Sequence, residues 1–369
     1  MASLEITTAV VPARRSPARK LLRPLAPVRQ VLDRVVWFFD QSEVARSKGA
    51  NRLRRGVALL FLAYGLELAA SQLAKGAFPT LGQGVLLMLS VALFVGRGGE
   101  FVRDLLAVVL ALFSYGLVSS FAEKLNFTVH YTPQIDVERF LFHGTLPTVW
   151  LQHHLGTART GWLAVFSVLM YLSHFVVPAV FGFVLWMKRK RHVFQALMFG
   201  LITVTLLGEM TFVLAPTGPP WLASQHGLTP HVDHLLKQAL GGMHLHQLAV
   251  REGNAGSYNI VAAMPSLHAG FPIVGLLVAI RYGLPRWVRA GLVLQFLGVV
   301  FAIVYMGDHY VVDTLVGVVY ACVAAFLVNR GLREDIRPAK ADPLGRAAPA
   351  PAPALAAATG PGAAGRGAR

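Results

Sequence analysis

Long apolar segments separated by short polar turns run through the middle of this chain. About eight can be drawn, each predicted to be a membrane-crossing helix: residues 57–75, 81–96, 105–122, 161–187, 193–214, 268–280, 288–306 and 311–329. A crossing helix needs roughly 20 apolar residues, so the second and sixth segments are short; the sixth is expected to begin near Ser266. Over these lengths, apolar and polar residues do not alternate with the period of two that is typical of a β-strand. The pattern therefore predicts an all-α fold, a polytopic membrane helical bundle of about eight spans.

Composition also favours a membrane protein. The chain is 55% hydrophobic and 14% charged, with a mean hydropathy of +0.55, whereas a soluble domain carries about 25% charged residues. The ends differ from the apolar middle, because residues 1–56 are basic and residues 331–369 are rich in Ala, Pro and Gly. Such segments cannot bury enough apolar surface to fold. We therefore predict a partly disordered N-terminal tail and a disordered C-terminal tail.

The positive charge predicts topology rather than nucleic acid binding. The net charge is +16, and cytoplasmic loops of membrane proteins carry an excess of Lys and Arg. If the N-terminus is cytoplasmic, all but six of the 34 Lys and Arg lie on that side, the six being Lys75, Lys124, Arg139, Arg159, Lys237 and Arg251. We therefore predict a multi-pass protein of the cell membrane with both termini cytoplasmic. No nucleic acid partner is expected, because no aromatic-interleaved binding motif accompanies the charge.

Histidine, not cysteine, marks the candidate chemistry. The single cysteine, Cys322, excludes a disulfide within the chain and a cysteine metal cluster. Most of the 13 histidines fall in two long external loops, 123–160 and 215–265, or at the external ends of predicted helices. Two pairs in the second loop could ligate a metal or belong to a solvated surface: His231/His234 and His244/His246. No cofactor and no metal are predicted.

Two short stretches, residues 264–270 and 307–313, are expected at the same membrane face. In the second, His309 and Asp313 are four residues apart, so on a helix they lie one turn apart on one face. The carboxylate can fix the tautomer of the imidazole and leave its other nitrogen free as a nucleophile. A structural Asp–His pair at a helix end is the alternative.

The first stretch suits the start of a helix. Pro265 and Ser266 are residue types favoured in the first turn and at the N-cap. Free backbone N–H groups at such a start bind anions such as phosphate. His268, in the first turn, could protonate a leaving oxygen; an exposed loop histidine is the alternative.

The order and spacing of these motifs resemble a known family. Pro-Ser-x-His at 265–268, followed about 40 residues later by His-x-x-x-Asp at 309–313, looks like the second and third motifs of the type 2 phosphatidic acid phosphatase superfamily. The resemblance covers roughly residues 105–329 and implies a six-helix phosphatase-like core. We therefore expect a catalytic core over 105–330 and two additional spans over 57–104.

The resemblance also implies roles for individual residues. His309 would be the nucleophile that forms a phosphohistidine, and Asp313 would orient it and balance its charge. His268 would be the general acid for the leaving group and then the base for the acceptor. Ser266 would bind phosphate oxygens. The further substrate-binding residues that we predict are Arg251, Asp308 and Tyr310.

The cations of the family's motifs are missing from this chain. Ala302 and Ile303 stand where the phosphatases have Ser-Arg, and residues 214–221 (LAPTGPPW) lack the Lys and Arg of the first motif. The phosphate-binding charge must come from elsewhere, and the external candidates are Arg251, Lys237, Arg139 and Lys124. This loss, with the loop at 131–152, is similar to the inositol phosphorylceramide synthase-like branch.

The sequence thus predicts a membrane phosphoryl-transfer enzyme acting on a lipid phosphate or phospholipid head group at the extracytoplasmic face. Transfer to inositol or another alcohol is expected for that branch. Hydrolysis of a lipid phosphate or prenyl diphosphate, with water as acceptor, is the alternative within the class. A membrane transporter is the alternative from another class, but it would place ionisable residues near mid-membrane. Within the fifth segment, Glu209 is expected to face the bundle and pair with a polar group such as His174; a structural hydrogen-bond acceptor is the alternative.

Overall fold

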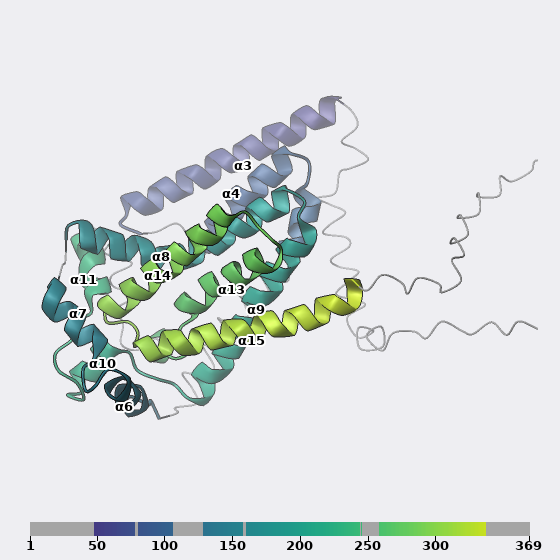
Figure 1. Ribbon diagram of the computed structural model, residues 1–369. Helices are drawn as coiled ribbons and strands as arrows, with labels where there is room; N and C mark the ends of the chain where they lie inside the picture. The colour runs from purple at the N-terminus through teal and green to yellow at the C-terminus, as the bar shows by residue number, and fades with distance from the viewer. Residues whose placement is uncertain are drawn as a thin grey trace, which may run out of the picture.

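A computed structural model describes residues 48–77, 80–105, 128–157, 160–243, 245 and 258–336, and these are overwhelmingly helical. No strand occurs among them, although two isolated bridges join Thr217 to His130 and to Ala262. Figure 1 shows a bundle of long, roughly aligned helices with short helices at one end. The helices are α3 (Lys48–Ala74), α4 (Leu81–Phe94), α6 (Thr132–Leu141), α7 (Pro147–Leu155), α8 (Trp162–Met187), α9 (Arg191–Leu214), α10 (Pro220–Gln225), α11 (Leu235–Gly242), η3 (Tyr258–Val261), α13 (Leu267–Arg281), α14 (Arg286–Tyr305) and α15 (Val311–Ile336).

The long helices follow the predicted apolar segments closely. Five are long and apolar enough to cross a membrane, namely α3, α8, α9, α14 and α15, and α4 and α13 are shorter apolar helices. The third predicted segment, 105–122, lies almost wholly outside the described residues, so the total of eight spans stays a prediction. The all-helical fold is confirmed for the described residues, and the apolar helices agree with a multi-pass membrane protein.

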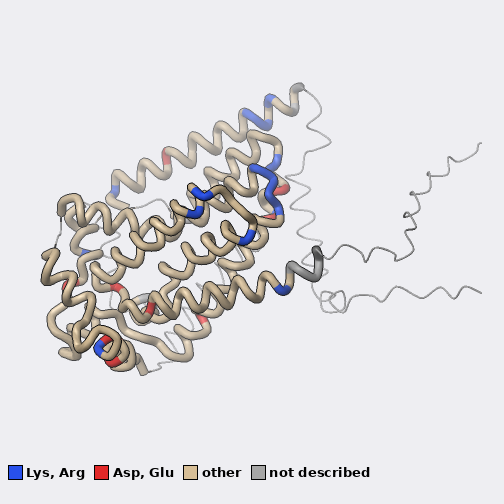
Figure 2. The backbone as a smooth tube through the Cα atoms, in the orientation of Figure 1, with Lys and Arg blue, Asp and Glu red and all other residues tan. Residues whose placement is uncertain are grey.

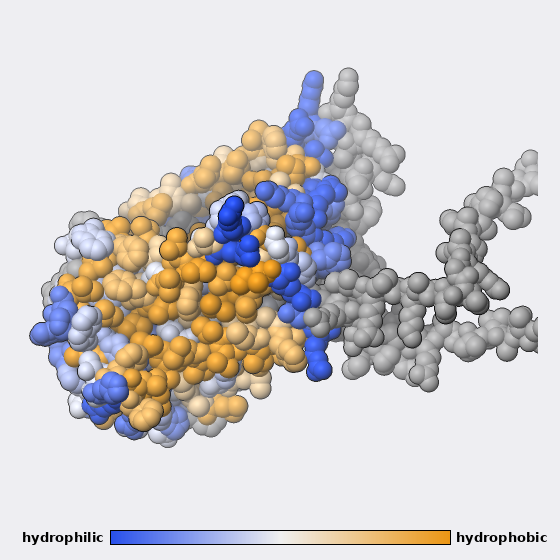
Figure 3. Space-filling model, viewed as in Figure 1, coloured by the Kyte–Doolittle hydropathy of each residue, from blue (hydrophilic) through white to orange (hydrophobic). Residues whose placement is uncertain are grey.

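Helix α13 is the centre of the bundle. It contacts α8, α9, α14 and α15, while α3 packs on α4. The largest core cluster joins α13 to α8, α9 and α15 through residues such as Trp186, Leu197 and Val274. The outward faces are apolar, and Figure 3 shows a broad hydrophobic surface over the bundle, as expected for contact with lipid tails.

The short helices α6, α7, α10 and α11 gather at one end of the bundle (Figure 1). Thr217 links the loops there: its carbonyl accepts from Ala263 and its hydroxyl from Met264, while its N–H donates to Val261. Gln152 of α7 donates to the carbonyls of Asp233 and Tyr305, each at 2.9 Å. The loops are therefore tied to the ends of the long helices.

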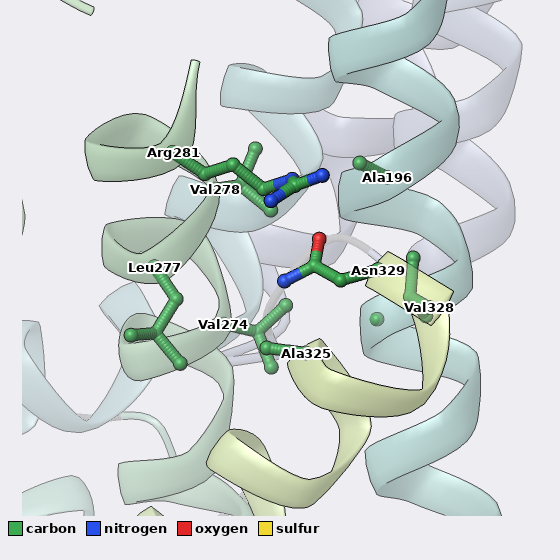
Figure 4. A pocket seen from close by; sticks show the side chains of 9 residues that line it. Ala196, Val274, Leu277, Val278, Arg281, Ala325, Val328 and Asn329 are labelled. Atoms are coloured by element: carbon green, nitrogen blue, oxygen red, sulfur yellow. The ribbon is translucent and has the colours of Figure 1, made fainter. Parts of the chain in front are cut away.

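The opposite end of the bundle is basic. In Figure 2 the Lys and Arg gather where α3 begins and α15 ends. Figure 4 shows a small cavity at this end, lined by Arg281 of α13 and Asn329 of α15. Its volume of about 10 Å³ has room for about one water, so it is a packing defect rather than a ligand site.

Candidate active site

The two sequence motifs meet at the end of the bundle covered by the short helices. His268 lies in the first turn of α13, and His309 lies two residues before α15 begins. The Nε2 atom of His309 is 3.1 Å from Nδ1 of His268, a hydrogen-bonding distance. The structure therefore brings together the two imidazoles that the sequence predicts at one face.

Asp313 completes this group from within α15. Its Oδ2 atom lies 3.5 Å from Nδ1 of His309, at the outer limit of a hydrogen bond, and its side chain is fully buried. The same oxygen accepts the backbone N–H of Tyr310 at 2.8 Å. Such a carboxylate favours a proton on Nδ1 of His309 and leaves the lone pair on Nε2, the atom facing His268.

The start of α15 is capped by a side chain from a distant helix. Tyr310 precedes the helix and offers no capping oxygen, whereas Oε1 of Glu138 on α6 accepts the N–H groups of Val311 and Val312. Glu138 is fully buried. Because free N–H groups at a helix start require acceptors, Glu138 holds in place the helix that carries Asp313. Sequence reasoning missed this residue.

Burial raises the pKa of the Glu138 carboxyl from its ordinary 4.5 to about 7, although the backbone donors of Val311 and Val312 lower it in part. The folded protein thus holds this proton more tightly than the unfolded chain, and unfolding releases it between pH 4.5 and about 7. The stability that the bound proton contributes is complete below this window and is lost as pH rises through it.

We predict that Glu138→Gln removes this pH dependence, which amounts to at most on the order of 3 kcal/mol. Glutamine keeps the shape and an acceptor oxygen but has no proton to release. The measurement is thermal unfolding of wild type and variant in detergent, at one pH below and one above the window. The same pH-dependent loss in both proteins would contradict the assignment.

Ser266 fixes the start of α13 against α15. Its hydroxyl accepts the N–H of Ala269 at 3.4 Å, so it is the N-cap that the sequence predicts, and its own N–H donates to the carbonyl of Asp313 at 3.0 Å. A Cβ at Gly317 would stand 2.2 Å from the Ser266 carbonyl oxygen. Glycine is therefore required where the two helices approach. The binding of phosphate by Ser266 stays a prediction.

A third histidine lies beside the pair. His174 of α8 is buried, and its ring centroid is 4.0 Å from that of His268. Its Nδ1 atom contacts the carbonyl oxygen of Tyr171, whose ring also lies against His268. The predicted pairing of His174 with Glu209 is wrong, since no ion pair or hydrogen bond joins these two described residues. A histidine inside an apolar span was the signal available in the sequence.

Asp308 connects the site to the second external loop. Its Oδ1 atom lies 3.1 Å from Nε2 of His234, and the His234 ring stacks on Trp221. His234 also lines an open hollow of about 340 Å³, whose wall includes Lys237 and His231. His231 approaches a different carboxylate, and within the described ranges no group of three or more His, Cys, Asp or Glu has a metal-binding arrangement. His244 and His246 lie outside the described residues.

Tyr310 is buried in a small apolar cluster with Ile135, Leu146 and Ala223. Loss of contact with water raises the pKa of its hydroxyl above the ordinary value. The structure thus places this ring in the packing between α15 and the short helices. Its predicted contact with substrate stays a prediction.

The expected phosphate-binding cation is not found next to the three central side chains. Among the described residues, no Lys or Arg forms a hydrogen bond or ion pair with His268, His309 or Asp313. Arg139 is exposed on α6 and Lys237 lines the outer hollow. Arg251 and Lys124 lie outside the described residues.

Comparison with known proteins agrees with this arrangement. Over 184 residues the chain is 30% identical to the phosphoinositol dihydroceramide synthase of Bacteroides thetaiotaomicron, a match that covers 49% of this chain and 58% of the relative. No solved structure matches the chain. Residues 135–327, which include both motifs, match the family described as the PAP2 superfamily, the type 2 phosphatidic acid phosphatases and their relatives. Because this match spans more than half of the chain, the protein belongs to the PAP2 superfamily.

Proposed function

We propose that this protein is an integral membrane phosphotransferase that moves a phosphoryl-alcohol head group from a phospholipid to an alcohol acceptor. The observation that carries the proposal is the contact of His268 with His309 beside buried Asp313. This group offers a nucleophile, a carboxylate that orients it, and a second imidazole for proton transfer. The similarity to a synthase named for joining phosphoinositol to dihydroceramide supports an alcohol, rather than water, as acceptor.

The reaction has two half-steps. In the first, Nε2 of His309 attacks the phosphorus and the bond from phosphorus to the lipid oxygen breaks. His268, which starts as the imidazolium, gives a proton to that oxygen and becomes neutral. In the second, His268 takes the proton of the acceptor hydroxyl, whose oxygen attacks the phosphorus and releases His309. Asp313 stabilises the positive charge on His309 in the intermediate. The protons balance within His268, and no metal is required.

The direct contact between the imidazoles has a consequence for substrate entry. Reacting atoms stand about 3–3.5 Å apart before attack, and Nε2 of His309 already has Nδ1 of His268 at 3.1 Å. A phosphoryl group therefore reaches His309 only after the His268 ring turns aside. The site in this state is closed, and substrate binding opens it.

The charge distribution supports an extracytoplasmic site. The Lys and Arg gather at the end where α3 begins and α15 ends (Figure 2), and the positive-inside rule assigns such an end to the cytoplasm. His268 begins α13 and His309 precedes α15, so both belong to the other end of the bundle. A donor lipid of the outer leaflet would reach the site from the side.

The outer hollow is the proposed location for the polar part of the substrates. Its wall carries hydroxyl, amide and charged side chains, which suit an alcohol-rich head group: Ser224, Gln225, His231, Asp233, His234, Lys237 and Gln238. His234 links this wall to Asp308, the residue before His309. A head group bound here would be close to the reacting histidine.

In the decisive experiment, the purified protein is reconstituted in vesicles and given phosphatidylinositol that carries a label at phosphorus. Dihydroceramide is present in one reaction and absent from another. We expect label to appear in a new phosphosphingolipid when the acceptor is present, and little release of inositol phosphate without it. Release of water-soluble phosphate that is independent of the acceptor would instead establish hydrolysis. No product of either kind, with a range of phospholipid donors, would contradict the proposal.

A further inference from the structure

His174 is a buried imidazole whose surroundings leave one nitrogen unused. A carbonyl oxygen can accept but not donate, so the contact with Tyr171 assigns the proton of the neutral ring to Nδ1 of His174. The other nitrogen, Nε2, then carries a lone pair. Among the described residues, the hydrogen bond of Nδ1 is the one found for this ring. Nε2 can therefore bind a ligand without first breaking a hydrogen bond to a described residue.

The position of His174 relates it to the reacting atoms. Helix α8 packs on α13, and the His174 ring lies 4.0 Å from the His268 ring, centroid to centroid. The His268 ring in turn occupies the space that a phosphoryl group needs next to Nε2 of His309. A phosphoryl group in that space would therefore lie next to the His174 ring.

The site also needs positive charge that it does not draw from Lys or Arg. A buried phosphate anion is stable only when it is paired or hydrogen-bonded. No described Lys or Arg contacts His268 or His309, and Asp313 adds a further negative charge. An imidazole that takes up a proton can supply both a positive charge and an N–H donor.

We propose that His174 is a third histidine of the phosphate-binding site: as the head group enters, Nε2 takes a proton from solvent and donates to a phosphoryl oxygen. The inference rests on the proposed phosphotransferase function. It assigns to an anionic phosphoryl group a ligand on α8, in addition to the motif residues on α13 and before α15.

Substitution of the ring tests the inference. His174→Phe keeps an aromatic ring but removes both nitrogens. We expect the KM for the phospholipid and the inhibitory concentration of orthovanadate to rise about 10- to 100-fold, as for loss of one charge-assisted hydrogen bond. His154→Phe is the matched control, because His154 is an exposed histidine at the same end whose Nδ1 also binds a carbonyl of its own helix, that of Trp150. The control should behave as wild type.

Two amide variants separate binding from packing, even if His174→Phe fails to fold. The amide nitrogen of Gln can take the place of Nε2, whereas that of Asn takes the place of Nδ1. We therefore expect His174→Gln to bind orthovanadate more tightly than His174→Asn. Binding is read from protection against thermal unfolding, which needs no turnover. Equal or reversed affinities, or wild-type affinity in His174→Phe, would overturn the inference, whereas absence of transfer by wild type would instead remove the proposed function.

Discussion

His309→Ala will abolish transfer, lowering kcat/KM by at least about 10⁴-fold. The variant lacks the only nitrogen that, in the proposed reaction, forms a bond to phosphorus. Wild type quenched during turnover with labelled donor should carry acid-labile, alkali-stable label on the chain, as expected of a phosphorylated imidazole, and the variant should carry none. The measurement is transfer rate together with label retained on denatured protein.

The folded state of this variant must be established separately. His309 is buried, so its loss leaves a cavity and could lower the stability. His309→Gln fills more of the space and should also be inactive. His153→Ala, which removes an exposed histidine from α7 at the same end, should remain active. Full activity in a folded His309→Ala or His309→Gln protein would remove the mechanism.

His268→Ala will lower kcat by about 10²–10⁴-fold with a natural phospholipid donor, the range typical of a lost general acid or base. The reason is that the alkoxide of diacylglycerol is strongly basic and therefore a poor leaving group unless it receives a proton. A donor whose leaving group is 4-nitrophenol needs no proton in the first half-step, so its first turnover should be nearly normal. The measurement is the burst of nitrophenol compared with the steady-state rate.

The two donors separate proton transfer from positioning. His268 contacts the His309 ring at 3.1 Å. If it only holds that ring in place, the rates with both donors should fall by the same factor, in the burst and in the steady state. If His268 is the acid and then the base, the nitrophenyl donor should show a burst followed by slow turnover, because the acceptor hydroxyl still needs a base. Equal losses with both donors would contradict the assigned role.

Local patterns in the sequence were sufficient to predict the long helices and to identify the two motifs. The limits of α8, α9 and α14 lie within two residues of the predicted apolar segments, since length and hydropathy alone fix a membrane span. Helix α15 begins where predicted but continues past residue 329 to Ile336. Ser266 was expected to start the sixth segment and is the N-cap of α13. The pairing of His309 with Asp313 follows from a spacing of four residues. The division into a core over 105–330 and two additional spans stays a prediction.

Contacts between distant segments could not be predicted in this way. Glu138 caps α15 across 173 residues of sequence, and no motif joins the two. Thr217 lies in the stretch that lacks the family's cations, yet it fastens the segment leading to Ser266. His174 was expected to pair with Glu209 on the neighbouring span, but it faces His268. The His174 contact depends on the rotation of α8 about its axis, which an apolar span of nearly uniform hydrophobicity does not specify. The contacts of Glu138 and Thr217 depend on how a short helix and a loop pack over the end of the bundle.

The sequence by itself determined that the chain forms a bundle of long apolar helices and that two imidazoles and a carboxylate lie at one end of that bundle. These features depend on hydropathy, charge and spacings of a few residues, which are written along the chain. Only the tertiary structure decided that His268 contacts His309 directly, that Glu138 supports the helix of Asp313, and that a third histidine adjoins the pair. Such contacts arise because α13 packs among α8, α9, α14 and α15 in one particular register, and side-chain packing between helices, unlike helix formation, has no short-range signature.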